Sequence, residues 1–198
     1  MAGLSDKSKS AAFLREGAVR TFVVTVVAAI LLAGCATAPS GPTVKTDEFS
    51  KDITIVSVPK GENPFAGIFR LWRLRSWVNK DTGVARHQLY VDLHYNFSWK
   101  FFQSASDESA TPLNVVSIDK EVIDCHSFCD YSETVGIELS DATLRSHLDS
   151  GYRIKLGAKS GDSVILEVTP EMLAQQFAEV DKYAKPQVST APATSRKN

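Results

Sequence analysis

The sequence lacks the excess of basic charge that nucleic-acid-binding proteins carry. Its 198 residues include 22 basic and 23 acidic side chains, for a formal net charge of −1. A protein that follows a phosphate backbone concentrates lysine and arginine on one face, because these residues neutralise the phosphates. We therefore do not expect nucleic acid to be a partner.

Recognisable catalytic and cofactor motifs are also absent. The sequence contains no Gly-x-Ser-x-Gly, His-Glu-x-x-His, P-loop or Gly-x-Gly-x-x-Gly pattern. His87 and His94 are seven positions apart on one expected strand, and this odd spacing points them to opposite faces, so they cannot share a metal ion. We expect no cofactor and no metal. A catalytic triad dispersed along the chain stays open, because triads need no fixed spacing.

Only one long stretch of the chain is free of charge, and it lies near the N-terminus. Thr21 to Gly34 is apolar and ends in small residues, and four basic side chains precede it (Lys7, Lys9, Arg15 and Arg20). The stretch is too short to cross a bilayer, which takes about 20 apolar residues. Basic, apolar and small segments in this order predict a secretion signal over residues 1–34.

Leu32-Ala33-Gly34-Cys35 resembles the lipobox of bacterial lipoproteins, and the resemblance covers the first 35 residues only. It implies cleavage between Gly34 and Cys35, a diacylglyceryl group on the thiol, and a fatty acid such as palmitate on the freed amine. Several acyl chains anchor a protein far more firmly than one does. Ala36 takes the place of the Asp that favours inner-membrane retention in Gram-negative lipoproteins. The resemblance thus implies an outer-membrane protein facing the periplasm.

The chain after the signal divides into three parts. Residues 35–48 and 185–198 are rich in Ala, Thr, Pro and Ser and bury too little apolar area to order, so they predict a flexible tether and a disordered tail. Residues 49–184 are expected to form a single globular domain. Removing the four basic and two acidic residues of the signal leaves 18 basic and 21 acidic side chains.

Alternation of apolar and polar residues indicates strands. The clearest case runs from Leu89 to Phe101 and predicts one long strand over Ala85–Gln103, paired with Ile68–Asn79 through a turn at Lys80–Gly83. Six further strands are expected over Asp52–Pro59, Leu113–Ile118, Lys120–Asp124, Thr134–Leu139, Tyr152–Ala158 and Ser163–Thr169.

Two helices are expected in the C-terminal half. Ser140 can cap a short helix over Asp141–Ser150 that Gly151 ends. Thr169 can cap a second helix that begins at Pro170. The fold class is therefore α+β, with a mainly antiparallel sheet of six to eight strands, a short helix and a C-terminal helix.

Cys125 and Cys129 flank three residues, His126-Ser127-Phe128. Outside the cytoplasm thiol pairs are generally oxidised, and a three-residue hairpin loop would bring the two α-carbons within disulfide range. We favour a disulfide that shapes a local turn. A redox pair and a metal site including His126 are alternatives, but the redox motif has two intervening residues and the metal site lacks a fourth ligand.

Arginines alternate with tryptophans between Arg70 and Trp77. Period two places Arg73, Arg75 and Trp77 on one side of a strand, where guanidinium and indole groups could face an anionic or sugar ligand. We favour the simpler interpretation, in which the arginines pair with acidic neighbours and the tryptophans pack in the core.

Two functions fit these observations. The first is a non-enzymatic, membrane-anchored module that binds or scaffolds another envelope component, either a protein or peptidoglycan. The second is a tethered hydrolase of an envelope substrate that uses dispersed residues such as Asp92 or His94. A pocket holding a group with a strongly shifted pKa favours the hydrolase, and an exposed apolar patch favours the binding module.

Overall fold

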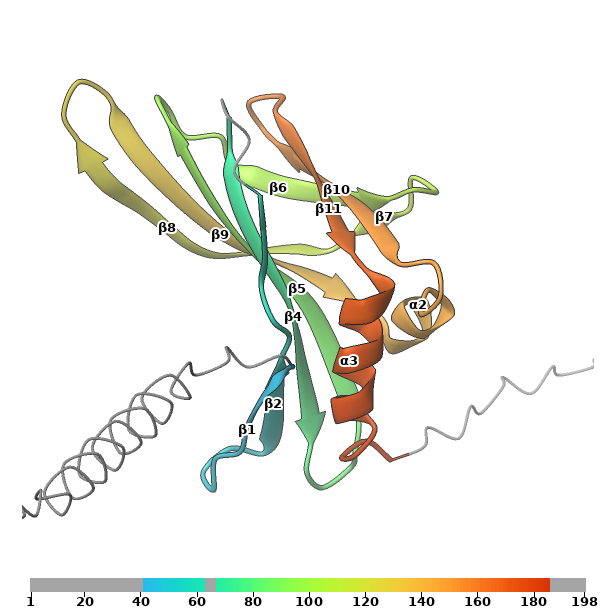
Figure 1. The fold of residues 1–198 in the computed structure, drawn as a ribbon. Coiled ribbons are helices and arrows are strands. Elements are labelled where there is room, and N and C mark those ends of the chain that lie inside the picture. Colours follow the sequence, from blue (N-terminus) through green and yellow to red (C-terminus); the bar gives the residue numbers. More distant parts are fainter. Residues whose placement is uncertain (1–40, 63–66, 186–198) are drawn as a thin grey trace, which may run out of the picture. The chain divides into compact units, whose positions relative to one another are not determined.

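Residues 41–62 and 67–185 are described by the structure, a computed structural model (Figure 1). The predicted signal, its cleavage point between Gly34 and Cys35, and the lipid attachment at Cys35 lie outside the described residues. Most of the predicted tail 185–198 lies outside them too. The described residues belong to one compact unit of the chain.

A seven-stranded antiparallel sheet, sheet A, forms the framework. Its strands are β1 (Thr43–Lys45), β2 (Asp52–Val56), β3 (Lys60–Glu62), β4 (Phe69–Asn79), β5 (Ala85–Asn96), β8 (Val115–Cys125) and β9 (Cys129–Leu139). They lie in the order β1-β2-β4-β5-β9-β8, and β3 also pairs with β4. Strand β8 therefore forms one edge of the sheet.

The predicted hairpin of β4 and β5 is confirmed and lies at the centre of sheet A. Val78 pairs with Ala85, and the pairing continues to Phe69 and His94. The side-chain oxygen of Asn79 accepts hydrogen bonds from the amides of Asp81 and Thr82, which closes the turn. Alternate residues are buried along both strands, as period two requires.

The long strand predicted over Ala85–Gln103 is wrong at its C-terminal end. Strand β5 ends at Asn96, and a corner over residues 97–101 leads into β6 (Phe102–Asp107). Phe97 and Phe101 adopt left-handed backbone conformations, with φ of 81° and 58°. These values interrupt the extended backbone, so the alternation of Phe97, Trp99 and Phe101 arises in a corner and not in a strand.

A second, four-stranded sheet, sheet B, covers part of sheet A. It has the order β11-β10-β6-β7, with β7 (Pro112–Leu113), β10 (Tyr152–Ala158) and β11 (Ser163–Val168). Its inward residues meet those of β4, β5 and β9 in one apolar core. At the contact, the indole of Trp72 donates a hydrogen bond of 2.9 Å to the carbonyl of Glu167.

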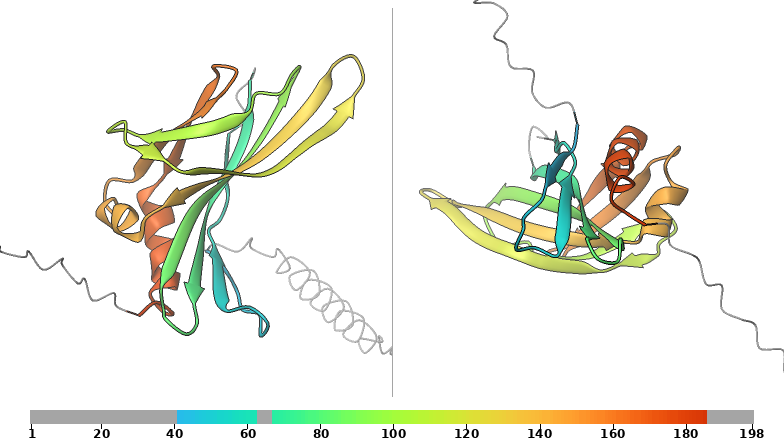
Figure 2. Two further views of the ribbon diagram at one scale, coloured as in Figure 1. Left: turned by 180° about the vertical axis from the view of Figure 1, so that it is seen from behind. Right: turned by 90° about the horizontal axis from the view of Figure 1, so that it is seen from below.

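Both helices pack on the same side of sheet A as sheet B, and the opposite face of sheet A, its open face, carries no covering element among the described residues (Figure 2). The short helix α2 spans Asp141–Ser146, with Ser140 as its N-cap. The C-terminal helix α3 spans Pro170–Val180, with Thr169 as its N-cap. The predicted fold class, a mainly antiparallel α+β domain with a short and a C-terminal helix, is confirmed.

Several boundaries differ from the predicted ones. Strand β1 lies inside residues 35–48, which were expected to be a tether, and it pairs with β2. Helix α2 ends four residues earlier than predicted, and the amide of Gly151 bonds to the carbonyl of His147. Sheet A has seven strands, and sheet B brings the total in the described residues to eleven.

Strands β8 and β9 form a hairpin longer than predicted, and it reaches away from the two helices (Figure 1). The register of β8 shifts between Ser117 and Asp119 and again between Val122 and Asp124. The first shift coincides with the gap between the two strands predicted here. Each bulge leaves one residue without a partner on β9.

Candidate functional site

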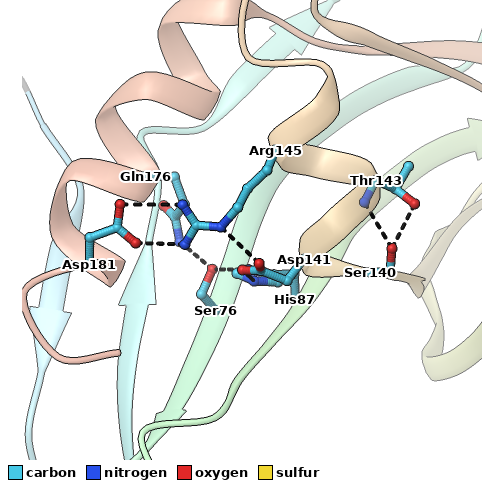
Figure 3. A network of polar contacts seen from close by, with 8 residues as sticks. All are labelled: Ser76, His87, Ser140, Asp141, Thr143, Arg145, Gln176 and Asp181. Atoms are coloured by element: carbon cyan, nitrogen blue, oxygen red, sulfur yellow. Dashed lines mark hydrogen bonds and ion pairs between the residues drawn. The ribbon is translucent and has the colours of Figure 1, made fainter. Parts of the chain in front are cut away.

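A buried serine, a buried histidine and a partly exposed aspartate are joined by hydrogen bonds near the two helices (Figure 3). The Oγ of Ser76 on β4 is 2.8 Å from Nδ1 of His87 on β5. The Nε2 of His87 is 3.1 Å from Oδ1 of Asp141, the first residue of α2. On the other side, Nε2 of Gln176 on α3 donates to Ser76 Oγ at 2.8 Å.

The chemistry of the partners sets the direction of these bonds. A carboxylate only accepts, so the Nε2–H of neutral His87 donates to Asp141, and Nδ1 accepts from the Ser76 hydroxyl. Burial lowers the pKa of His87, against the opposing effect of Asp141, and favours this neutral form. Arg145 then links Asp141 to Asp181, with donor distances of 2.8 and 2.6 Å.

The arrangement resembles a catalytic triad in its residue types but not in its access. Ser76 has 0% of its surface exposed and His87 has 4%. A hollow of about 380 Å³ opens beside Trp77 and Asp141, and its lining includes His87 but not Ser76. Because the hydroxyl faces no opening, the three residues connect β4, β5 and α2 and present no nucleophile to a substrate.

The predicted hydrolase candidates Asp92 and His94 lie on the open face of sheet A. Asp92 accepts a hydrogen bond of 2.9 Å from the hydroxyl of Thr134 and forms an ion pair of 3.4 Å with Arg73. His94 packs against Phe69, with ring centroids 5.7 Å apart. As predicted, His94 and His87 occupy opposite faces of β5.

A buried carboxylate holds the corner between the two sheets. Glu133 on β9 has no exposed surface and accepts hydrogen bonds from the amides of Phe101 and Phe102, at 2.8 and 3.1 Å. It also accepts one from the hydroxyl of Tyr95. Burial, followed by the bond to Glu133, raises the pKa of Tyr95, so the phenol stays a donor. The Glu133 carboxylate thus provides acceptors for two backbone amides of the corner that have no strand partner.

A mainly aromatic cluster, in part exposed and in part half-buried, lies beside that corner, at the end of the β8–β9 hairpin. We call it the hairpin patch, and it comprises Phe97, Trp99, Phe101, Val122, Phe128 and Tyr131. The ring centroids of Phe97 and Phe128 are 5.3 Å apart, although 75% and 55% of their surfaces are exposed. Trp99 lies 4.7 Å from Tyr131 and 6.1 Å from Phe101.

The hairpin that carries the patch is acidic. Residues 115–131 hold four carboxylates and one lysine, and their carboxylates belong to Asp119, Glu121, Asp124 and Asp130. The lysine, Lys120, has its ammonium 4.9 Å from the ring of Phe101. A hollow of about 630 Å³ adjoins the patch and is lined by Tyr95, Phe97 and Val164 among others.

The predicted cysteine pair closes the end of the same hairpin. Cys125 and Cys129 are directly paired across β8 and β9, and their α-carbons are 4.0 Å apart. The pair is thus placed as a disulfide requires, around the loop of three residues that the sequence suggested.

The predicted ligand face is assembled as period two requires. Arg73, Arg75 and Trp77 lie together on the open face of sheet A, next to Tyr90. The favoured interpretation is partly right: Arg73 pairs with Asp92, and Trp72 is buried in the core. Trp77 does not enter the core, because it lies on the open face. There it is half-buried and packs against the guanidinium of Arg75.

Among the described residues, no group of three or more histidine, cysteine or acidic side chains is placed to hold a metal ion. No helix of residues 41–62 and 67–185 is long and apolar enough to cross a membrane. No protein-family model, curated protein or solved structure matches the chain.

The hairpin patch and the buried network escaped the sequence reasoning for different reasons. Phe97, Trp99 and Phe101 were visible as part of an alternating run, but alternation assigned all three to the core face of a strand. The network joins residues from three elements far apart in the chain, so no local signal marks it.

Proposed function

We propose that this chain is a bacterial lipoprotein, anchored through Cys35, whose sheet-rich domain docks onto a protein partner in the cell envelope. The observation that carries the docking role is the hairpin patch. Large apolar patches on a protein surface mark interaction sites, and aromatic residues dominate the contacts at which binding energy concentrates. Ala36 and the lipobox support an outer-membrane location facing the periplasm.

The charge of the hairpin supports a protein partner over a bilayer. Segments that insert into anionic membranes surround their apolar residues with lysine and arginine. Here four carboxylates outnumber one lysine, so an anionic surface repels the hairpin. A protein surface that is apolar at its centre and basic around it complements the hairpin patch in both respects.

The partner is expected to contact side chains and not to add a strand to β8. The two register shifts interrupt the outer edge of β8, and the charged Asp119, Lys120 and Glu121 lie between them. Bulges and charges of this kind prevent another strand from pairing with an edge. The aromatic side chains beside the corner are therefore the contact surface.

The oxidising compartment implied by the lipobox also favours a closed disulfide between Cys125 and Cys129. Such a bond fixes the hairpin end on which Phe128 is carried. Labelling of free thiols in the unreduced mature protein tests this, and reaction of both cysteines would contradict it.

Site-specific photocrosslinking tests the docking role. A photoreactive amino acid at Val122, in the patch, is compared with one at Ile165 on β11, whose exposed fraction is similar at 42% against 47%. In cells we expect an adduct of one defined mass from position 122 and none from position 165. The double variant Phe97→Ser/Phe128→Ser should abolish it, and Glu121→Gln/Asp124→Asn should weaken it.

Three results would overturn this role. They are an adduct that survives the double phenylalanine change, the same adduct from position 165, and an adduct that consists of two copies of this chain. A separate labelling with an alkyne fatty acid tests the anchor. Label should be incorporated by the wild-type chain and lost from Cys35→Ser, and retained label in that variant would exclude lipidation at Cys35.

A further inference from the structure

Arginines and aromatic rings alternate in space on the open face of sheet A. Tyr90 has two guanidinium carbons over its ring, that of Arg73 at 4.6 Å and that of Arg75 at 4.7 Å. Trp77 likewise has Arg75 at 5.0 Å and Arg86 at 5.9 Å. We call the five residues the arginine ladder, and Arg75 is its centre.

The strand register builds this ladder. Arg73, Arg75 and Trp77 follow one another at period two on β4, and Arg73 lies directly opposite Tyr90 on β5. Trp77 lies directly opposite Arg86. Long side chains on one face of paired strands reach both direct and diagonal neighbours, which is why each ring meets two guanidinium groups.

The two end arginines have carboxylate partners and the central one has none among the described residues. Arg73 pairs with Asp92 at 3.4 Å, and Arg86 pairs with Asp52 at 2.8 Å. Arg75 forms no ion pair with any residue of 41–62 or 67–185. Arg75 is half-buried as a residue, and its guanidinium lies over two rings that hold it in place while its N–H groups stay without an ion-pair partner.

We infer that Arg75 is an anion-binding site for a ligand that carries a single negative charge shared by two oxygens. Guanidinium binds such groups through two parallel hydrogen bonds, and prior ordering by aromatic stacking lowers the entropy lost on binding. Three arginines facing two aspartates leave one positive charge, which matches a carboxylate or a phosphodiester.

The geometry also restricts how a sugar would bind. Guanidinium groups already occupy the faces of Tyr90 and Trp77, so these rings offer little surface for stacking a neutral sugar. Recognition then depends on the charged group of the ligand. The site is independent of the hairpin patch, because the patch includes none of its five residues.

Titrations of the full-length chain in neutral detergent, followed by NMR of the arginine side-chain N–H groups, test this site. The probes are N-acetylmuramic acid, which carries a carboxylate, glycerophosphoglycerol, which carries a phosphodiester, and uncharged N-acetylglucosamine as a control. We expect saturable shifts with at least one charged probe and none with the uncharged sugar. The responding probe identifies the source of the anion.

Variants locate the effect at Arg75. Arg75→Gln should weaken binding at least tenfold, and Arg75→Lys should weaken it to a similar extent because an ammonium cannot form the paired hydrogen bonds. Arg153→Gln, on the exposed side of β10, removes the same charge elsewhere and should bind as the wild type does. Preserved amide spectra establish that each variant is folded.

Wild-type affinity in Arg75→Gln, equal losses in Arg75→Gln and Arg153→Gln, or saturable binding of N-acetylglucosamine would each overturn the inference. So would the absence of saturable shifts with both charged probes. None of these results bears on the crosslinking at Val122, so the site and the proposed docking role can fail separately.

Discussion

The helix-covered end of sheet A and the end of the β8–β9 hairpin treat polar and apolar groups in opposite ways. Under α2 and α3, the buried groups Gln176, Ser76 and His87 are hydrogen-bonded in a chain that ends at the partly exposed Asp141 (Figure 3). At the hairpin end, large apolar rings such as Phe97 and Phe128 are left in solvent. The helix-covered end thus buries its polar groups, whereas the hairpin end leaves apolar surface available for a partner.

Glu133 lies between these two regions and ties the corner of residues 97–101 to β9. It accepts two backbone amides and the Tyr95 hydroxyl in a fully buried position. Loss of this acceptor should therefore disturb the patch and the core together.

The largest effect is expected for Glu133→Ala. It leaves three buried donors without an acceptor, and we expect the free energy of unfolding to fall by about 3 to 5 kcal/mol. Chemical denaturation measures the change. Glu133→Gln keeps one side-chain carbonyl and should lose clearly less. A loss below about 1 kcal/mol for Glu133→Ala would contradict the role of this carboxylate.

The next effect concerns the hairpin end alone. Cys125→Ser/Cys129→Ser opens a loop of three intervening residues, for which loop-closure entropy gives about 2 kcal/mol. Denaturation should show this loss relative to the oxidised wild-type protein, and hydrogen exchange should accelerate in β8 and not in β4. Reduced wild-type protein should match the variant. Identical stability of reduced and oxidised wild type would show that no such bond forms.

A pH-dependent effect should come from the helix-covered end. The pKa of His87 is lowered on folding, chiefly by burial, so below about pH 6.5 the unfolded chain takes up a proton that the folded protein does not. Stability then decreases as the pH falls from about 7.5 to 5.5, with a slope of at most about 1.4 kcal/mol per pH unit.

Denaturation at a series of pH values measures this slope. His87→Gln should flatten it, whereas His126→Gln, in the exposed hairpin loop, should leave it as in the wild type. If the His87 variant keeps the full slope over this range, another group is responsible.

The smallest effect is expected within the patch. Val122→Ala removes a side chain that is 47% exposed and should change the free energy of unfolding by less than about 0.5 kcal/mol. The same change at buried Val91 should cost about 2 kcal/mol, because it removes apolar contacts and leaves a cavity. Equal losses at the two positions would mean that the patch belongs to the core.

Local signals account for the parts of the fold that the sequence predicted. The caps Ser140 and Thr169 and the β4–β5 turn all act within a few residues, so their positions could be read directly. The corner at residues 97–101 could not, because Glu133, more than 30 residues away, supplies its acceptor.

The same distinction applies to the candidate sites. Arg73, Arg75 and Trp77 share a face because of period two, which the sequence displays. Their relation to Tyr90 depends on the register between two strands, and Arg75 stands out only when the partners of Arg73 and Arg86 are known. The contacts among Ser76, His87 and Asp141 could be predicted only if the order of the strands were known as well.

The two register shifts in β8 have a consequence for crowding. Proteins held on a membrane by lipid diffuse in two dimensions, where their edges meet far more often than in free solution. A flat edge of eleven residues would then join neighbouring copies into continuous sheets. The two register shifts interrupt the row of backbone N–H and C=O groups on the outer edge of β8, so the edges of two copies cannot pair over their full length. With the lipid anchor proposed above, many copies would then share one surface without aggregating.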